Sequence, residues 1–375
     1  MKTVGKRVNP TQRVHEGDLN STHGKNATRW PAEWEPKDAL ILTWPENRET
    51  WPGERLKRIE GVYVELLIAM ASRERVICLV SSQSMREYAE QKVYQSRTPG
   101  QTLTLEWLVL PSNDLWIRDY GPIGVWKGNE PVWLNWTYNA WGGKYPPFDL
   151  DDSMPEALAE RYQVKTQPLS TVLEGGAIDG NGQGVLLTTK AVLQSPTRNP
   201  GVSQGALDEI LAETLGCRHV CWFDEGLRGD DTDGHVDDFA RFVRKDTILI
   251  AQDLPGGPNE AVLAANKKTL EVFIERVKEH EGYEIKLHEL PMPQCEIDGS
   301  TVDGSSVVPA SYANFVFGAQ TVYVPLYDPN TDDQAISCFK EVLPDYEIVG
   351  IQCNDLVWGQ GSIHCVTQNL IGLSG

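Results

Sequence analysis

The stretch RLKRIEGVYVELLIAMAS at residues 55–72, followed by VICLV at residues 76–80, indicates the fold class. Apolar side chains recur through the first stretch at Leu56, Ile59, Val62, Leu66, Leu67 and Met70. This spacing predicts a helix, and the continuous apolar run after it predicts a buried strand. A helix that leads directly into a buried strand is typical of an α/β fold.

The same alternation continues along the chain. Further helices are expected at residues 85–94, 204–215, 259–279 and 333–342, and further strands at residues 103–110, 123–126, 132–138, 219–223, 239–243, 247–252, 283–289 and 346–351, with a hairpin around residues 318–320. A unit of roughly 50–70 residues, with two or three strands and one helix, recurs and favours a closed, propeller-like array. No Gly-, Pro- or Ser-rich linker interrupts it, so we expect an N-terminal arm at residues 1–29 and a single domain at residues 30–375.

The composition limits the kinds of binding partner and cellular location to consider. The 375-residue chain has a formal net charge of −19, which disfavours nucleic acid and suits a small cation. The same charge would also simply keep a protein soluble. No apolar run approaches the roughly 18 residues of a membrane span, and no apolar block follows the basic residues of the arm, so a cytoplasmic protein is expected. Seven scattered cysteines without a CxxC pair disfavour disulfides and zinc ribbons.

Four polar loops lie next to apolar strands, where functional groups are often found. They are NDLWIRDYGP at residues 113–122, LEGG at 173–176, GDDTDGHVDD at 229–238 and WGQGSIHC at 358–365. The third loop is acidic, yet it lacks the twelve-residue calcium-loop pattern with its closing glutamate.

His235 and Asp237 lie two residues apart in the third loop. If the segment is extended, both side chains face the same way, and the carboxylate can orient the imidazole and raise its basicity. This arrangement suits a general acid and base. A turn histidine with a structural role, or a metal ligand, is the alternative.

Cys365 ends the fourth loop, after Gly359 and Gly361, which would let the backbone approach a bound group. It precedes Val366 in an expected strand. The side chain of the adjacent His364 should face away from the sulfur, so His235 is the natural base for Cys365. The alternative is that Cys365 is a small buried apolar residue.

Two carboxylates, Asp119 and Asp237, with Glu174 in reserve, match a delocalised cation, because a planar guanidinium presents paired N–H donors. Trp116 could offer a ring face to the same cation. The alternatives are an ion pair between Asp119 and Arg118, and a core role for Trp116. Acids around Cys365 should raise its thiol pKa, so an arriving guanidinium or a protonated His235 is needed to form the thiolate.

Several motifs, in order, carry a resemblance to a known family. They are WPAEWEP (30–36), TWP (43–45), ETWPG (49–53), NDLWIRDYGP, NAWGGKYPPFDLDD (139–152), LEGGAIDGNGQGVLLTT (173–189), DDTDGHVDDFARFV (230–243), PASYANF (309–315) and DLVWGQGSIHCVTQ (355–368). Over residues 30–368 the chain resembles the agmatine deiminase family, which includes bacterial-type peptidylarginine deiminases.

The resemblance implies a pentein fold, a five-bladed α/β propeller with a central active site and neither metal nor organic cofactor. It implies hydrolysis of a small guanidine, most simply agmatine to N-carbamoylputrescine and ammonia, by a soluble enzyme that could form a homodimer. Cys365 resembles the nucleophile, His235 the general acid and base, and Asp119 and Asp237 the pair that holds the guanidinium. Trp116, Glu174 and Asn314 resemble groups of the pocket wall or its support.

Two departures concern substrate identity: many agmatine deiminases have glycine where this chain has Gln360, and T-Q-Q-x-P where it has TQNL at residues 367–370. Alternative functions are a peptidylarginine deiminase, an amidinotransferase on the same fold, and a guanidine-binding module without catalysis. A papain-like protease would need a different spread of Cys and His and an Asn that orients the His.

Overall fold

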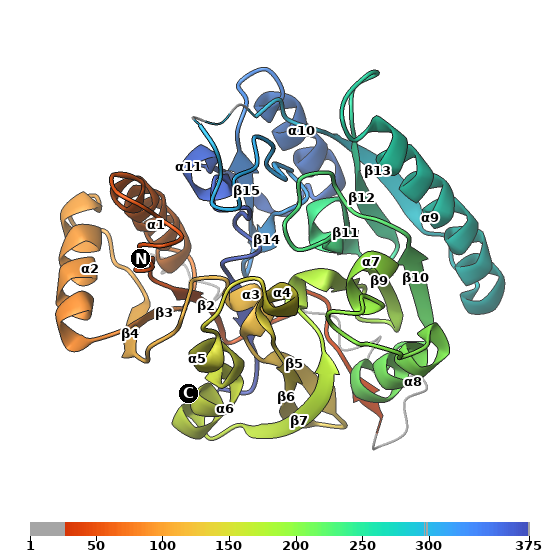
Figure 1. The fold of residues 1–375 in the computed structure, drawn as a ribbon, viewed down its shortest axis with the longest axis horizontal. Coiled ribbons are helices and arrows are strands. Elements are labelled where there is room, and N and C mark those ends of the chain that lie inside the picture. Colours follow the sequence, from red (N-terminus) through yellow and green to blue (C-terminus); the bar gives the residue numbers. More distant parts are fainter. Residues whose placement is uncertain (1–26, 296, 298, 374–375) are drawn as a thin grey trace, which may run out of the picture.

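The computed structural model describes residues 27–295, 297 and 299–373. It consists of five small sheets arranged around a common centre, with most helices on the periphery (Figure 1). The expected arm lies outside the described residues up to residue 26. Its last two residues, Thr28 and Arg29, form strand β1 and pair with β5.

Each sheet contains three or four strands. In spatial order they are β1 (Thr28–Arg29), β5 (Ile123–Lys127), β6 (Glu130–Thr137) and β7 (Lys165–Val172); β10 (His219–Phe223), β9 (Val185–Thr189) and β8 (Ile178–Gly180); β11 (Ala240–Arg244), β12 (Thr247–Gln252) and β13 (Lys286–Pro291); β14 (Val316–Phe317), β15 (Thr321–Leu326) and β16 (Glu347–Gln352); and β17 (Gln368–Leu370), β2 (Ala39–Thr43), β3 (Val76–Val80) and β4 (Leu105–Val109).

One connection recurs in all five sheets. Two strands pair antiparallel, and a helical crossover then brings the chain back parallel to the second strand, as in β11, β12 and β13. The helices are α1 (Arg55–Ala71), α2 (Gln83–Ser96), α3 (Ile117–Tyr120), α4 (Ala140–Gly143), α5 (Asp149–Asp152), α6 (Met154–Tyr162), α7 (Lys190–Leu193), α8 (Gln204–Leu215), α9 (Glu260–Glu281), α10 (Asp332–Val342) and α11 (Asn354–Val357), with short 3₁₀ helices η1 (Gly175–Ala177) and η2 (Val236–Asp238). A crossover is required because parallel neighbours cannot be joined by a tight turn.

The last sheet joins the two ends of the described chain. β17 pairs antiparallel with β2, so that Leu370 lies opposite Ala39. Trp133 of the neighbouring sheet donates its indole N–H to the carbonyl of Ile371 at 2.9 Å. The final strand therefore completes a sheet that the N-terminal strands begin, and it contacts the sheet that follows them.

The expected elements are largely confirmed. Helix α1 ends one residue before the expected range, and strand β3 matches it. The buried side of α1 carries Leu56, Ile59, Val62, Leu66, Leu67 and Met70, which are the residues of the apolar pattern. The mixed α/β class predicted from the sequence is thus correct.

Five strands and one longer helix were not expected from the sequence. They are β1, β2, β7, β8, β9 and α6. β7 is mostly half-exposed or exposed and contains a proline, so neither an apolar run nor strict alternation marks it. β8 has only three residues and ends in glycine.

Two further observations concern the chain as a whole. Among the described residues, no helix is long and apolar enough to cross a membrane. All seven cysteines are described and each has a free thiol, as the sequence predicted.

The closing strand provides a test of the fold. Leu370 is fully buried in β17, so Leu370→Ala is expected to lower the free energy of unfolding by about 2–5 kcal/mol, through lost burial and the cavity left behind. Denaturant unfolding followed by fluorescence measures the change. Leu254→Ala is the matched control because that side chain is 55% exposed, and it should change stability by less than about 0.5 kcal/mol. Equal effects at both positions would contradict a buried closing strand.

Candidate active site

Segments far apart in the sequence bring the predicted site residues together near the centre of the sheets. Asp119 lies in the single-turn helix α3, Glu174 directly precedes η1, His235 directly precedes η2, and Cys365 lies in a turn before β17. All four side chains are at least nine-tenths buried. The site therefore forms only when α3, η1, η2 and the turn before β17 come together.

Gly176 lies in contact with three of the predicted groups. A β-carbon at this position would lie 2.6 Å from His235 Nδ1, 2.9 Å from Asp119 Oδ1 and 3.0 Å from Asp237 Oδ2. The backbone N–H of Gly176 donates to Asp119 Oδ1 at 3.0 Å. Only a residue without a side chain lets the three groups approach so closely, which explains the second glycine of the LEGG loop.

His235 lies between two acids without a direct hydrogen bond to either. Its Nδ1 is 3.7 Å from Asp119 Oδ1, and its Nε2 is 3.8 Å from Glu174 Oε2. Burial alone would lower its pKa, but the charges of Asp119, Glu174 and Asp237 outweigh burial and raise the pKa of His235 to about 10. At neutral pH the ring is therefore an imidazolium that can donate a proton.

The pKa of Asp119 is raised as well, which for an acid disfavours the charged form. Burial raises its pKa, His235 lowers it, and the neighbouring acids Asp237 and Glu174 raise it further, to about 6. Its Oδ2 accepts a hydrogen bond from the indole N–H of Trp141 at 3.1 Å. The carboxylate is therefore held in place by a backbone donor and a side-chain donor, but its charge is lost in mildly acidic solution.

Four polar atoms around this centre have no hydrogen-bond partner among the described residues. They are His235 Nδ1, His235 Nε2, Glu174 Oε2 and Asp237 Oδ1. Buried polar groups are normally hydrogen-bonded. Two unpaired carboxylate oxygens next to a protonated ring indicate a place where a ligand with more than one N–H donor would bind.

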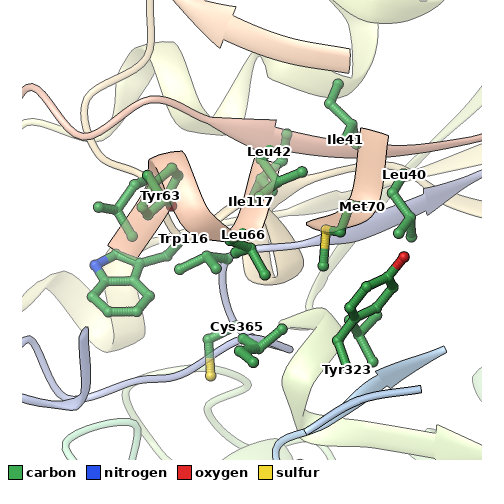
Figure 2. Packing of buried hydrophobic residues seen from close by; sticks show 14 of the residues in the cluster. Leu40, Ile41, Leu42, Tyr63, Leu66, Met70, Trp116, Ile117, Tyr323 and Cys365 are labelled. Atoms are coloured by element: carbon green, nitrogen blue, oxygen red, sulfur yellow. The ribbon is translucent and has the colours of Figure 1, made fainter. Parts of the chain in front are cut away.

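Cys365 borders both this polar centre and the apolar core. Figure 2 shows its sulfur pointing away from the apolar side chains of α1 and β2. Asn314 fixes it from the other side: Nδ2 donates to the sulfur at 3.1 Å and to Asp238 Oδ1 at 2.9 Å, while Oδ1 accepts from the backbone N–H of His364 at 2.9 Å. The support role predicted for Asn314 thus has a direct geometric basis.

The thiol is not activated by its own surroundings. Burial and the charges of Asp237, Asp238 and Asp119 raise the pKa of Cys365 well above its ordinary value. His235 is already protonated at neutral pH, so in the resting site it is not free to accept the thiol proton. The pKa of the thiol stays raised despite this positive charge, so an arriving guanidinium is the further charge that can lower it.

Asp237 is held by a second histidine. His364 Nδ1 lies 2.6 Å from Asp237 Oδ2, and His364 Nε2 lies 2.7 Å from Glu33 Oε2. Burial opposes the charged form of Asp237, but the hydrogen bond and charge of His364, with His235 and Arg241, lower its pKa below the ordinary value. His364 thus orients one of the two predicted substrate-binding acids.

Glu33, Asp238, Trp141 and Arg241 complete the site, and the sequence analysis did not assign roles to them. Glu33 accepts from Arg241 Nη2 at 3.0 Å and lies on the WPAEWEP motif. Its position in a quoted motif was the available signal. The others lie within quoted motifs as well, but nothing in their local pattern distinguishes them from structural residues.

The structure corrects several local expectations. The segment after His235 is a 3₁₀ turn and not extended, so His235 and Asp237 do not lie on one face of a strand. Both side chains instead lie close to Gly176. Cys365 lies in a turn, and the strand begins only at Gln368. The alternative of an ion pair between Arg118 and Asp119 is not what the structure has: Arg118 donates to the carbonyl of His364 and to Gln368 Oε1.

Gly359 and Gly361 make room for indole rings. A β-carbon on Gly359 would lie 2.3 Å from Trp51, and one on Gly361 would lie 2.3 Å from Trp116. The expected close approach of backbone to ligand is therefore an approach of backbone to tryptophan. Trp116 is pinned there and lines a cavity of about 40 Å³ together with Asp119, Trp141, Tyr145, Asp231 and Gln360.

One group among the described residues has metal-ligand character: Asp237, Asp238 and Cys365, whose ligand atoms all lie within 4.8 Å of one another. Burial and the charges of Asp237 and Asp230 raise the pKa of Asp238 well above its ordinary value. Metal ligands must be deprotonated. The surroundings disfavour the ionised forms of Asp238 and Cys365, and Asn314 donates to both, so the group fits a hydrogen-bonded network better than a metal site.

Fold and site together describe an α/β enzyme with a buried thiol, an imidazolium and paired carboxylates at the centre of its sheets. The family model described as Porphyromonas-type peptidyl-arginine deiminase matches residues 29–370, and the chain belongs to this family. This agrees with the resemblance seen in the motifs.

Solved structures support the same relationship. An agmatine deiminase of Enterococcus faecalis is 29% identical, covers 92% of this chain and 96% of its own, and superposes with a TM-score of 0.81. A Cys-to-Ser variant of a Campylobacter jejuni agmatine deiminase with substrate bound is 27% identical, with the same coverage and TM-score. An amidinotransferase from Microseira wollei, 11% identical over 94% of this chain and 99% of its own with a TM-score of 0.51, shares the fold.

The pKa of Asp119 leads to a pH prediction. Below about pH 6 this carboxyl is protonated, so affinity for a small cation such as methylguanidine should fall as pH drops from 7 to 5. Calorimetric titration across this range measures the change. Asp119→Asn carries no charge at any of these pH values, so it should bind about 10–100-fold more weakly at pH 7 and lose most of the pH dependence. Affinity of the unsubstituted protein that is flat from pH 7 to 5 would contradict this role.

The contact between His364 and Asp237 leads to a second prediction about the pH dependence of binding. His364→Phe removes the hydrogen bond that helps to keep the pKa of Asp237 low, so methylguanidine affinity should weaken and its acid limb should move to higher pH. The same titration compares it with His219→Phe, whose ring pairs with Glu281 away from the site. An unchanged pH dependence in His364→Phe would show that His364 does not tune Asp237.

Proposed function

We propose that this protein hydrolyses agmatine to N-carbamoylputrescine and ammonia through a covalent intermediate on Cys365. The observation that carries the proposal is the convergence of a buried thiol, an imidazolium and two carboxylate oxygens without partners, Glu174 Oε2 and Asp237 Oδ1, around the centre next to Gly176. A guanidinium ion supplies the N–H donors that these oxygens lack, together with the positive charge that the acids favour.

Binding and orientation come first in the proposed reaction. Asp119 and Asp237 hold the guanidinium nitrogens, Glu174 adds a third acid, and Trp116 forms part of the wall. Positioning of this kind converts an encounter of two molecules into a reaction within one complex. Arg198 donates to Glu174 Oε1 at 2.9 Å, which leaves Oε2 facing His235 and the substrate.

Arrival of the substrate then forms the nucleophile. The cation offsets the acids that raise the thiol pKa, so Cys365 loses its proton to solvent when the substrate is bound. The thiolate adds to the guanidinium carbon, and the C–N bond to an unsubstituted nitrogen breaks. His235 protonates this nitrogen, which leaves as ammonia, and an amidino group remains on the sulfur.

Water completes the cycle. His235, now neutral, accepts a proton from the water that adds to the amidino carbon. The C–S bond breaks, the sulfur leaves, and the product is a ureido compound. Atoms balance as agmatine plus water giving N-carbamoylputrescine plus ammonia, without an external oxidant or reductant.

We also propose an overall architecture and a domain boundary. The five sheets are the blades of a pentein propeller, and residues 30–375 form a single catalytic domain. Support comes from the five-fold repetition of an antiparallel pair followed by a parallel strand, and from the pairing of β17 with β2. A homodimer and a cytoplasmic location stay predictions from the sequence.

The family description makes a peptidyl-arginine substrate the second candidate. The small cavity next to Asp119, with Trp116, Trp141 and Tyr145 in its wall, favours a slender free guanidine over an arginine in a folded protein. Parallel assays of ammonia release from agmatine, free arginine and an arginine-containing peptide distinguish them.

Cys365→Ser is expected to reduce ammonia release from agmatine by at least about 10³-fold, since a hydroxyl at neutral pH is a far weaker nucleophile than a thiolate. An enzyme-coupled ammonia assay measures the rate. Cys338→Ser is the matched control because this half-buried thiol lies in α10 and contacts the carbonyl of Glu289, away from the site. A Cys365→Ser protein as active as Cys338→Ser would refute the covalent mechanism.

A further inference from the structure

Gln360 occupies an unusual position in the wall of the cavity next to Asp119. Its φ of 75° lies in the left-handed region that is costly for a residue with a side chain. The side chain is nevertheless buried, with 7% of the residue exposed, and it lines the cavity together with Trp116 and Asp119. The amide therefore borders the same cavity as Asp119, the acid that we propose for guanidinium binding.

The orientation of this amide follows from its neighbours. Its Nε2 lies 2.9 Å from Asp303 Oδ1 and 3.3 Å from the carbonyl oxygen of Val307. Both neighbours are acceptors, so the NH₂ group must face them and the amide cannot be turned around. Oε1 is thereby directed to the other side, and it has no hydrogen-bond partner among the described residues.

We propose that Gln360 is a substrate-binding residue whose Oε1 accepts a hydrogen bond from an N–H group of the guanidine substrate. This inference rests on the proposed function and extends it to a neutral contact beyond the acids. A buried acceptor without a partner is costly, so a ligand that supplies the missing donor gains affinity there. Agmatine carries N–H donors at both its guanidinium and its amine end.

The loop that carries Asp303 gives this contact its rigidity. Asp303 Oδ1 also accepts from the backbone N–H of Ser305 at 3.1 Å, and the adjacent Val302 lines the cavity. The indole N–H of Trp358 donates to the carbonyl of Ser300 at 2.9 Å at the start of the same loop. The side-chain oxygen Oε1 of Gln360 is thus held in a fixed position, which limits the conformational entropy lost when a ligand binds.

Calorimetry on the Cys365→Ser background tests the proposal, because it measures binding without turnover. Gln360→Met keeps the length of the side chain and removes its acceptor, and Gln360→Gly suits the left-handed backbone and removes the whole amide. Both are expected to raise the Kd for agmatine by about 10-fold. A Kd within twofold of the parent for either folded variant would overturn the proposal.

Asp303→Ala distinguishes the contribution of the Gln360 Oε1 acceptor from that of the loop that holds the side chain. This variant removes one brace but retains Oε1 and the bond to Val307, so it should weaken agmatine binding less than Gln360→Met does. An equal loss in both would assign the effect to the loop and refute the role of Oε1.

Butylguanidine, which lacks the amine, identifies the donor. A loss for both ligands in Gln360→Met supports a guanidinium N–H, and a loss for agmatine alone supports the amine. If the Cys365→Ser parent binds neither ligand, the proposed function fails, and this inference fails with it. If the parent binds and only the Gln360 variants are unaffected, this inference fails alone.

Discussion

Burial of like charges is the constraint on which this structure depends. Asp119, Glu174, Asp237 and Asp238 are at least nine-tenths buried at one centre, where mutual repulsion and loss of hydration both oppose ionisation. The four acids differ in how this conflict shifts their pKa values. The pKa values of Asp237 and Glu174 are lowered while those of Asp119 and Asp238 are raised, so acids of one cluster differ in how readily they lose a proton.

Side chains in a surrounding layer that donate to these acids produce this difference. Arg198 holds one oxygen of Glu174, and His364 holds one oxygen of Asp237. Behind His364, Glu33 accepts from Arg241, whose Nε also lies 2.5 Å from Asp179 Oδ2. Each pairing leaves the second oxygen of the inner acid free of partners. The layer therefore neutralises enough charge for the fold to be stable and leaves unsatisfied oxygens facing inward.

The sequence predicted the parts of this arrangement that depend on local pattern. Helix α1 and strand β3 follow from side-chain periodicity, and the four polar loops were recognisable because each adjoins an apolar strand. The convergence of Cys365, His235, Asp119 and Asp237 followed from a resemblance and not from periodicity. Spacing alone suggested an extended segment after His235, whereas contact with Gly176 imposes a tight turn.

What the sequence could not provide were contacts between distant segments and their effect on protonation. His364 to Glu33 spans 331 positions, and Asn314 to Cys365 spans 51. The pKa of about 10 for His235 depends on Asp119 and Glu174 from two other segments as well as on Asp237 of its own loop, and it makes the ring a proton donor in the resting site at neutral pH. The neighbours of Gln360 likewise lie 53 and 57 positions away.

The pairing of β17 with β2 has a consequence for the folding rate. Leu370 lies opposite Ala39, so this pairing joins segments from opposite ends of the described residues. Contacts between segments so distant in sequence form slowly, because the entropy of closing a long loop is lost before the contacts stabilise the chain. His364 and Cys365 lie just before β17, so we expect their contacts with the acid cluster to be among the slow, long-range steps of folding.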